Sequence, residues 1–153
     1  MIERLHHHGF TVSDLEKSLA FYRDLLGLEV LRVSERRNLP SYDAILGFNG
    51  VALIVALLRH PVDEFLLELF QYLNPSVEKR PLSNHFAGAS HLAFEVKDID
   101  GQYARLRAAG YHSISPPVDV VREGKKVARA FYALDPDGIS VELFDEFADL
   151  VAS

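Results

Sequence analysis

The sequence predicts an α+β fold built from two similar β-α-β-β-β modules. Two observations lead to this prediction. A segment that begins at His7 is repeated at His91, and each copy runs into a helical pattern that ends at a glycine, Gly27 or Gly110. Apolar segments of strand length follow in both halves. A repeat of this kind favours two copies of one structural unit.

The two repeated segments share most of their polar and apolar positions. Residues 7–16 read HHGFTVSDLE and residues 91–100 read HLAFEVKDID. The matched positions hold His, Phe, Val and Asp, followed by Leu opposite Ile and Glu opposite Asp. One shared His and Val would mean little. A matched string followed by matched helix and stop signals predicts equivalent strands and helices in the two halves.

The first half begins with an expected strand over 7–12. Ser13 and Glu16 have the spacing of a capping box, so a helix is expected to begin there. Apolar residues at helical spacing continue to Leu26, and Gly27 suits the left-handed residue that ends a helix. Three strands are expected to follow, at 29–34, 51–58 and 65–72.

The second half repeats this plan. A strand is expected over 90–96, and Asp98 is expected to cap a helix that runs to Ala109 and ends at Gly110. Asp135-Pro136-Asp137-Gly138 is typical of a tight turn, because Pro presets the bend and Gly takes positive φ. The expected strands lie near Ser113, at 129–134 and at 139–144.

These elements predict a single domain over 1–153 made of two repeats. The first module spans 2–73, the second spans 90–147, and the polar, proline-containing stretch 74–89 connects them. Neither half is long enough to bury both faces of its own sheet. The two sheets are therefore expected to pair around a shared concave interior.

Composition excludes several classes of function. The chain has 153 residues, a net charge of −6 and no cysteine. An acidic chain does not favour nucleic acid or an anionic membrane as the partner, since those surfaces need clustered Lys and Arg. Without cysteine, any metal ion must be held by nitrogen and oxygen. No signal peptide or membrane-spanning apolar run is present, which predicts a cytoplasmic protein.

Four residues are the candidates for chemistry. His7 and His91 occupy equivalent places in the first strand of each half, and Glu68 and Glu142 occupy the last strand of each half, between apolar neighbours. A carboxylate in such an apolar strand is costly to bury unless it is paired or bound to a metal. Each of these residues alone is explained more simply as a polar residue on a half-exposed strand. Their occurrence as two equivalent His–Glu pairs favours a metal site instead.

These motifs resemble the vicinal oxygen chelate superfamily, which includes glyoxalase I, methylmalonyl-CoA epimerase, extradiol dioxygenases and bleomycin-resistance proteins. The resemblance covers roughly residues 2–146. It is carried by the two His-containing repeats, Phe21-Tyr22, Leu25-x-Gly27-Leu28, Glu68-Leu69, and Asp135-Pro136-Asp137-Gly138 ahead of Glu142-Leu143. The fold it implies is two βαβββ modules that pair into an incomplete barrel around a metal ion. Among the consecutive residues His6, His7 and His8, the family spacing selects His7 as the ligand.

The resemblance also implies an activity. His7, Glu68, His91 and Glu142 would bind one divalent ion, which could be Zn, Ni, Co, Mn or Fe. The implied enzyme is a metal-dependent isomerase or lyase that acts on a small molecule with two vicinal oxygens through an enediolate or enolate. Glu142 is the first candidate for the catalytic base and Glu68 the second. The resemblance further implies a homodimer, with the modules pairing within one chain or across two.

Two alternative functions stay open at this stage. An Fe(II) extradiol dioxygenase would use His7, His91 and Glu142 and would give Glu68 no metal role. A non-catalytic drug- or metabolite-binding resistance protein would need none of the four ligands. Arg129, Phe131 and Tyr132, on the strand beside Glu142, are candidate pocket residues, and alternation predicts that about half of them face inward.

Overall fold

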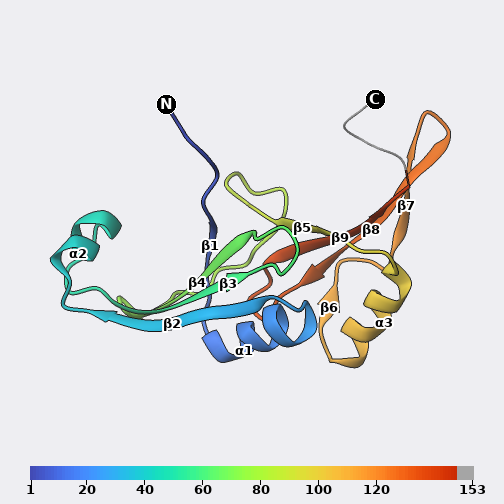
Figure 1. Cartoon of the computed structure of the whole chain (residues 1–153). Helices are drawn as coiled ribbons and strands as arrows, with labels where there is room; N and C mark the ends of the chain where they lie inside the picture. Colours follow the sequence, from blue (N-terminus) through green and yellow to red (C-terminus); the bar gives the residue numbers. More distant parts are fainter. Residues whose placement is uncertain (148–153) are drawn as a thin grey trace. The chain divides into compact units, whose positions relative to one another are not determined.

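The computed structural model describes residues 1–147. It divides into two compact units, the first over Met1–Arg80 and the second beginning at Pro81. Each unit contains one open β-sheet with helices, so the α+β class is confirmed (Figure 1). None of the described helices is long and apolar enough to cross a membrane.

The first unit contains a four-stranded sheet in the order β1-β4-β3-β2. β1 runs parallel to β4, and the other neighbours are antiparallel. The elements are β1 (His8–Thr11), α1 (Leu15–Leu19), a π-helical continuation η1 (Ala20–Leu25), β2 (Glu29–Arg37), α2 (Pro40–Leu46), β3 (Ala52–Arg59) and β4 (Leu66–Asn74).

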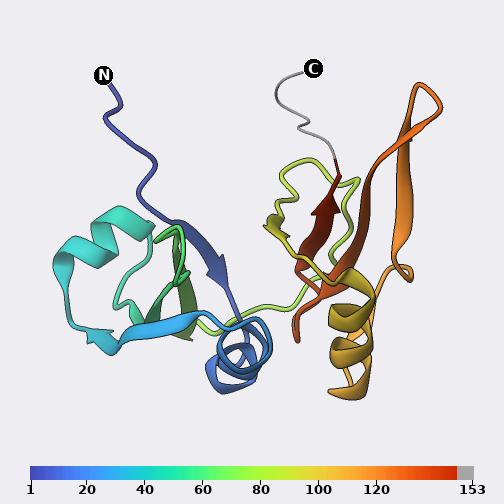
Figure 2. The ribbon, with the colours of Figure 1, turned by 45° about the vertical axis from the view of Figure 1, so that its right-hand side comes forward.

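The second unit repeats the sheet topology. Its path is β5-β9-β8-β6, with β7 also paired to β8, and β5 again runs parallel to the last strand. Figure 2 shows α3 lying along one face of this sheet. The elements are β5 (Leu92–Glu95), α3 (Ile99–Ala108), β6 (His112–Ser113), β7 (Val118–Arg122), β8 (Lys125–Leu134) and β9 (Ser140–Glu146).

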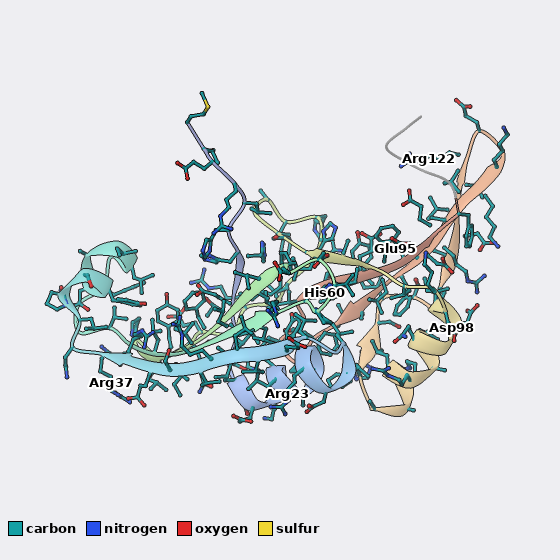
Figure 3. The ribbon with its side chains drawn as sticks, viewed as in Figure 1. Arg23, Arg37, His60, Glu95, Asp98 and Arg122 are labelled. Carbon is teal, nitrogen blue, oxygen red and sulfur yellow. The ribbon has the colours of Figure 1, made fainter. Side chains whose placement is uncertain are left out.

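Both predicted helices form where expected, with one correction at a cap. Asp98 caps α3 as predicted, because its carboxylate accepts the Gly101 N–H at 3.0 Å (Asp98 is labelled in Figure 3). In the first unit the cap is Asp14, which accepts the Lys17 N–H at 3.2 Å, and not Ser13. The capping-box prediction was wrong by one residue. The helix begins at Leu15, and the Asp14 carboxylate reaches the N–H of its third residue, Lys17.

Glycines end both helices in the left-handed conformation, as the sequence predicted. Gly27 has φ of 85° and Gly110 also has φ of 85°. The two helices bury apolar side chains against the sheets, with Leu19, Tyr22 and Leu106 almost fully buried. This packing covers one face of each sheet, and the His–Glu pairs lie on the opposite face.

Two elements were not expected. α2 lies between β2 and β3, where no helical period was assigned, and it begins with Pro40 in its first turn. Its Tyr42 and Leu46 pack on the buried cluster of Val51, Leu53 and Val55. β7 was also missed, because every one of its residues remains at least partly exposed and gives no apolar run.

The turn between β8 and β9 positions the strand that carries Glu142. The buried Asp135 carboxylate accepts the N–H groups of Asp137 and Ile139 at 2.9 and 2.8 Å. Gly138 has φ of 85°, so the predicted positive φ of this glycine is confirmed. The turn is fixed by one carboxylate that satisfies two backbone donors.

Replacing Asp135 by Ala is expected to lower the free energy of unfolding by about 2 kcal/mol, because two amide donors lose a charged acceptor. Urea denaturation measures the change. Asp135→Asn keeps an acceptor oxygen and should lose less than half as much. Equal losses for the two variants would show that the carboxylate acts through its charge and not through these two bonds.

Candidate metal centre

The first His–Glu pair lies on the first unit's sheet. β1 and β4 run in parallel with Gly9 opposite Glu68, so His7, two residues before Gly9, is on the same face as the glutamate. His7 Nε2 lies 3.2 Å from Glu68 Oε2. The His7 side chain is 39% exposed and the Glu68 side chain is 20% exposed, so the pair is accessible to a further ligand.

The second pair repeats this geometry in the other unit. Ala93 stands opposite Glu142 in the parallel pairing of β5 with β9, so His91 has the same offset from its glutamate as His7. His91 Nε2 lies 3.4 Å from Glu142 Oε2. The structure therefore brings each predicted His together with the Glu of its own module.

The spacing within each pair suits two ligands of one ion. Metal–nitrogen and metal–oxygen bonds to ions such as Zn²⁺ are about 2.0–2.2 Å long. Two such ligands on one ion are about 3.0 Å apart at a right angle and about 3.4 Å apart at a tetrahedral angle. The observed 3.2 and 3.4 Å fall in this interval. The donor set of imidazole nitrogen and carboxylate oxygen fits a divalent ion.

Each unit supplies only two such donors. Across residues 1–147, no group of three or more His, Asp or Glu side chains is placed to hold a metal ion. We refer to each pair, which offers one imidazole and one carboxylate, as a half-site. An ion held by two protein ligands alone would leave most of its coordination to water or substrate.

The three consecutive histidines have different surroundings. His8 faces the helix-covered side, where its ring contacts Phe10 edge-on with centroids 4.6 Å apart. Burial lowers the pKa of His8, and the neighbouring His7 lowers it further. The Nδ1 atoms of His6 and His7 lie 2.8 Å apart, leaving His7 Nε2 for Glu68. Only the middle histidine contacts the glutamate.

The two glutamates differ in their neighbours on the adjacent antiparallel strand. Leu57 of β3 stands opposite Glu68, whereas Tyr132 of β8 stands opposite Glu142. The Tyr132 hydroxyl lies 3.4 Å from Glu142 Oε2 and donates to it. Burial, and then the charge of Glu142, raise the pKa of Tyr132, so the hydroxyl keeps its proton at neutral pH.

Of the three candidate pocket residues on β8, only Tyr132 faces the His–Glu pair. Phe131 and Arg129 point to the helix side, where the Phe131 ring meets Tyr103 with centroids 5.4 Å apart. Arg129 forms ion pairs with Asp100 at 2.9 Å and with Asp119 at 3.2 Å. The alternation of β8 thus separates one candidate from two structural residues.

A cavity of about 460 Å³ lies further along the face that carries Glu68. Tyr72 lines it and is four residues beyond Glu68 on β4, which places it about 13 Å along the same face. Its aromatic walls and its size are typical of small-molecule sites. The lining residues are Thr11, Phe48, Tyr72, Pro75, Ser76, Val77, Glu78 and Arg80.

Comparison with known proteins identifies the family. Residues 4–143 match the family described as the Glyoxalase/Bleomycin resistance protein/Dioxygenase superfamily. Because this match spans most of the sequence, the chain belongs to that superfamily. The resemblance predicted from the two repeats and the turn is confirmed.

Individual relatives include enzymes of two kinds. A lactoylglutathione lyase of Salmonella typhimurium is 30% identical over 142 residues, covering 93% of this chain and 92% of the relative. The mitochondrial methylmalonyl-CoA epimerase of Homo sapiens is 30% identical over 142 residues, covering 92% of this chain and 72% of the relative. A solved glyoxalase family protein of Bacillus cereus has a TM-score of 0.83 at 21% identity, with 97% of both chains covered. This last likeness confirms the glyoxalase-type fold.

Proposed function

We propose that the protein is a metal-dependent isomerase or lyase that moves a proton between adjacent carbons of a small substrate with two vicinal oxygens. The observation that carries this proposal is the duplicated His–Glu pair, with Nε2–Oε2 distances of 3.2 and 3.4 Å in two equivalent registers. Relatives named as a lyase and an epimerase, each 30% identical, support the same class of chemistry.

In this proposal His7, Glu68, His91 and Glu142 together hold one divalent ion. Two imidazoles and two carboxylates suit Zn, Ni, Co, Mn or Fe(II). When bound, the ion would supply Lewis acidity toward the oxygens of the substrate. The two half-sites would contribute from one chain or from two chains of a homodimer.

The glutamates would carry the proton. Glu142 is the proposed base and Glu68 the second candidate, since each carboxylate lies on an apolar strand beside a histidine. The cavity that Tyr72 lines, further along the face of Glu68, would hold the part of the substrate remote from the reacting carbons. Its aromatic walls, Phe48 and Tyr72, favour a substrate with an apolar or planar group.

The two alternatives make different demands on the pairs. A dioxygenase with two His and one Glu would not need a carboxylate at position 68. A binding protein without a metal would not need either pair, although both are formed here. The complete donor set therefore supports the isomerase or lyase over both alternatives.

Elemental analysis of the untagged protein tests the proposal. We expect close to one metal ion per chain in the wild type and loss of the metal in both Glu68→Ala and His91→Ala. Glu95→Ala is the matched control, because Glu95 (labelled in Figure 3) lies on β5 and forms an ion pair with Lys97 at 2.7 Å. Iron kept in Glu68→Ala but lost in His91→Ala would favour the dioxygenase. No metal in any protein after reconstitution would contradict the proposal.

A further inference from the structure

The two half-sites are built alike but supported differently. In the first unit the residue opposite Glu68 is Leu57, which has no hydrogen-bond donor in its side chain. In the second unit Tyr132 touches both members of the pair. Its hydroxyl lies 3.4 Å from Glu142 Oε2, and its ring meets the His91 ring edge-on, with centroids 5.3 Å apart at 85°.

We propose that Tyr132 is the positioning residue of the second half-site. Because the first half-site has no such residue, the two half-sites would differ in their affinity for a divalent ion. This inference rests on the proposed metal site. It goes further, because it assigns a role to a residue that is neither a ligand nor a base.

The physical reason lies in how free the two ligands are. The His91 side chain is 45% exposed and the Glu142 side chain 25% exposed, so the surrounding protein leaves the imidazole in particular room to change rotamer. A hydroxyl that donates to one carboxylate oxygen restricts rotation of that carboxylate. An aromatic ring against the imidazole restricts the other ligand, as residues behind metal ligands commonly do.

The position of Tyr132 on β8 allows both contacts. Its neighbours two residues away on the same face are Leu134 and the small Ala130. The face is fixed by the register of Tyr132 with Glu142. Residues of the opposite face, such as Phe131, pack on α3 and cannot substitute for it.

Zn²⁺ affinity, measured by competition with a chromophoric chelator, tests the role of the hydroxyl. Tyr132→Phe keeps the ring and is expected to weaken Zn²⁺ binding roughly tenfold, while Tyr132→Ala, which loses both contacts, should weaken it roughly a hundredfold. Tyr103→Phe is the matched control, since Tyr103 packs edge-on against Phe131 on the helix-covered face. This variant should bind Zn²⁺ with the wild-type affinity. Wild-type affinity in Tyr132→Phe would overturn the inference.

NMR of the metal-free protein separates this inference from the proposed function. In Tyr132→Phe the side-chain carboxyl ¹³C signal of Glu142 should shift, because its hydrogen bond is lost, while the His91 ring signals stay in place. In Tyr132→Ala both sets of signals should shift. If these NMR shifts occur but the wild type fails to bind Zn²⁺, the positioning role is supported and the metal site is contradicted. Unchanged signals in both variants would overturn the positioning role.

Discussion

Replacing Glu142 by Gln is expected to reduce the rate of proton exchange at the reacting carbon of a substrate by about 10²–10⁴-fold, the usual contribution of a positioned general base. Gln keeps the length and shape of the side chain but cannot accept a proton at neutral pH. The expected loss is in the turnover of bound substrate, because the amide oxygen can still occupy the position of the carboxylate oxygen.

Exchange in D₂O measures this effect without knowledge of the physiological substrate. The metal-loaded protein is incubated with methylmalonyl-CoA or lactoylglutathione, the compounds named in its relatives, and loss of the carbon-bound proton is followed by NMR. Glu68→Gln tests the second candidate in the same assay. Glu95→Gln, on the same sheet, should exchange at the wild-type rate.

The comparison of the two variants assigns the base. A loss confined to Glu142→Gln supports the proposed role of Glu142. A greater loss in Glu68→Gln would move the base to the first half-site, where the neighbouring Leu57 leaves the carboxylate without the hydroxyl that Glu142 has. No exchange by the wild type on either compound would contradict both substrate classes.

Much of the fold was predictable because the signals were local and occurred twice. Asp98 and Gly110 mark the ends of one helix through a cap and a left-handed residue, and both roles depend only on residues within the helix and its ends. The repeat then extended this interpretation to the other half. The same locality explains the error at Ser13, where Asp14, one residue along, is an equally good cap.

The elements that were missed depend on tertiary contacts. α2 has no fully buried residue, and it is held mainly by Tyr42 and Leu46 against the sheet cluster around Leu53, which its own sequence does not reveal. Among the strands of residues 1–147, β7 pairs with β8 alone, at the sheet edge, and it buries no side chain fully. Neither segment has the apolar period on which sequence prediction rests.

The sequence identified the residues of the candidate site but not the side chains that surround them. Matching positions in the repeat selected His7, Glu68, His91 and Glu142, and the structure then placed each His beside the Glu of its own module. The proposed role of Tyr132 could not be inferred in this way, because it depends on which residue of β8 stands opposite Glu142. That register is set by the turn at Asp135 and by the helix-covered face. Strand alternation predicts that Tyr132 and Phe131 lie on opposite faces of the sheet. Only the register shows that Tyr132 is on the face that carries Glu142.

Divalent metal is expected to stabilise the wild-type protein by about 4 kcal/mol when its free concentration is about a thousandfold above the dissociation constant. For a chain of this size each kcal/mol corresponds to about 2–4 °C, so the melting temperature should rise by roughly 10 °C. The physical reason is that the folded protein would bind the proposed ion through its preformed His–Glu pairs, whereas the unfolded chain would not. Calorimetry with and without Zn²⁺ measures the shift.

A double-mutant cycle then distinguishes one shared site from two separate ones. If one ion contacts all four ligands, His7→Ala and His91→Ala each remove nearly the whole metal-dependent stabilisation, and the double variant loses no more than either single variant. If each pair binds its own ion, the two losses add, because the sites are independent. Additive losses would therefore contradict the four-ligand centre even if the protein binds metal. Dependence of the shift on protein concentration in the wild type would show that the two half-sites come from different chains.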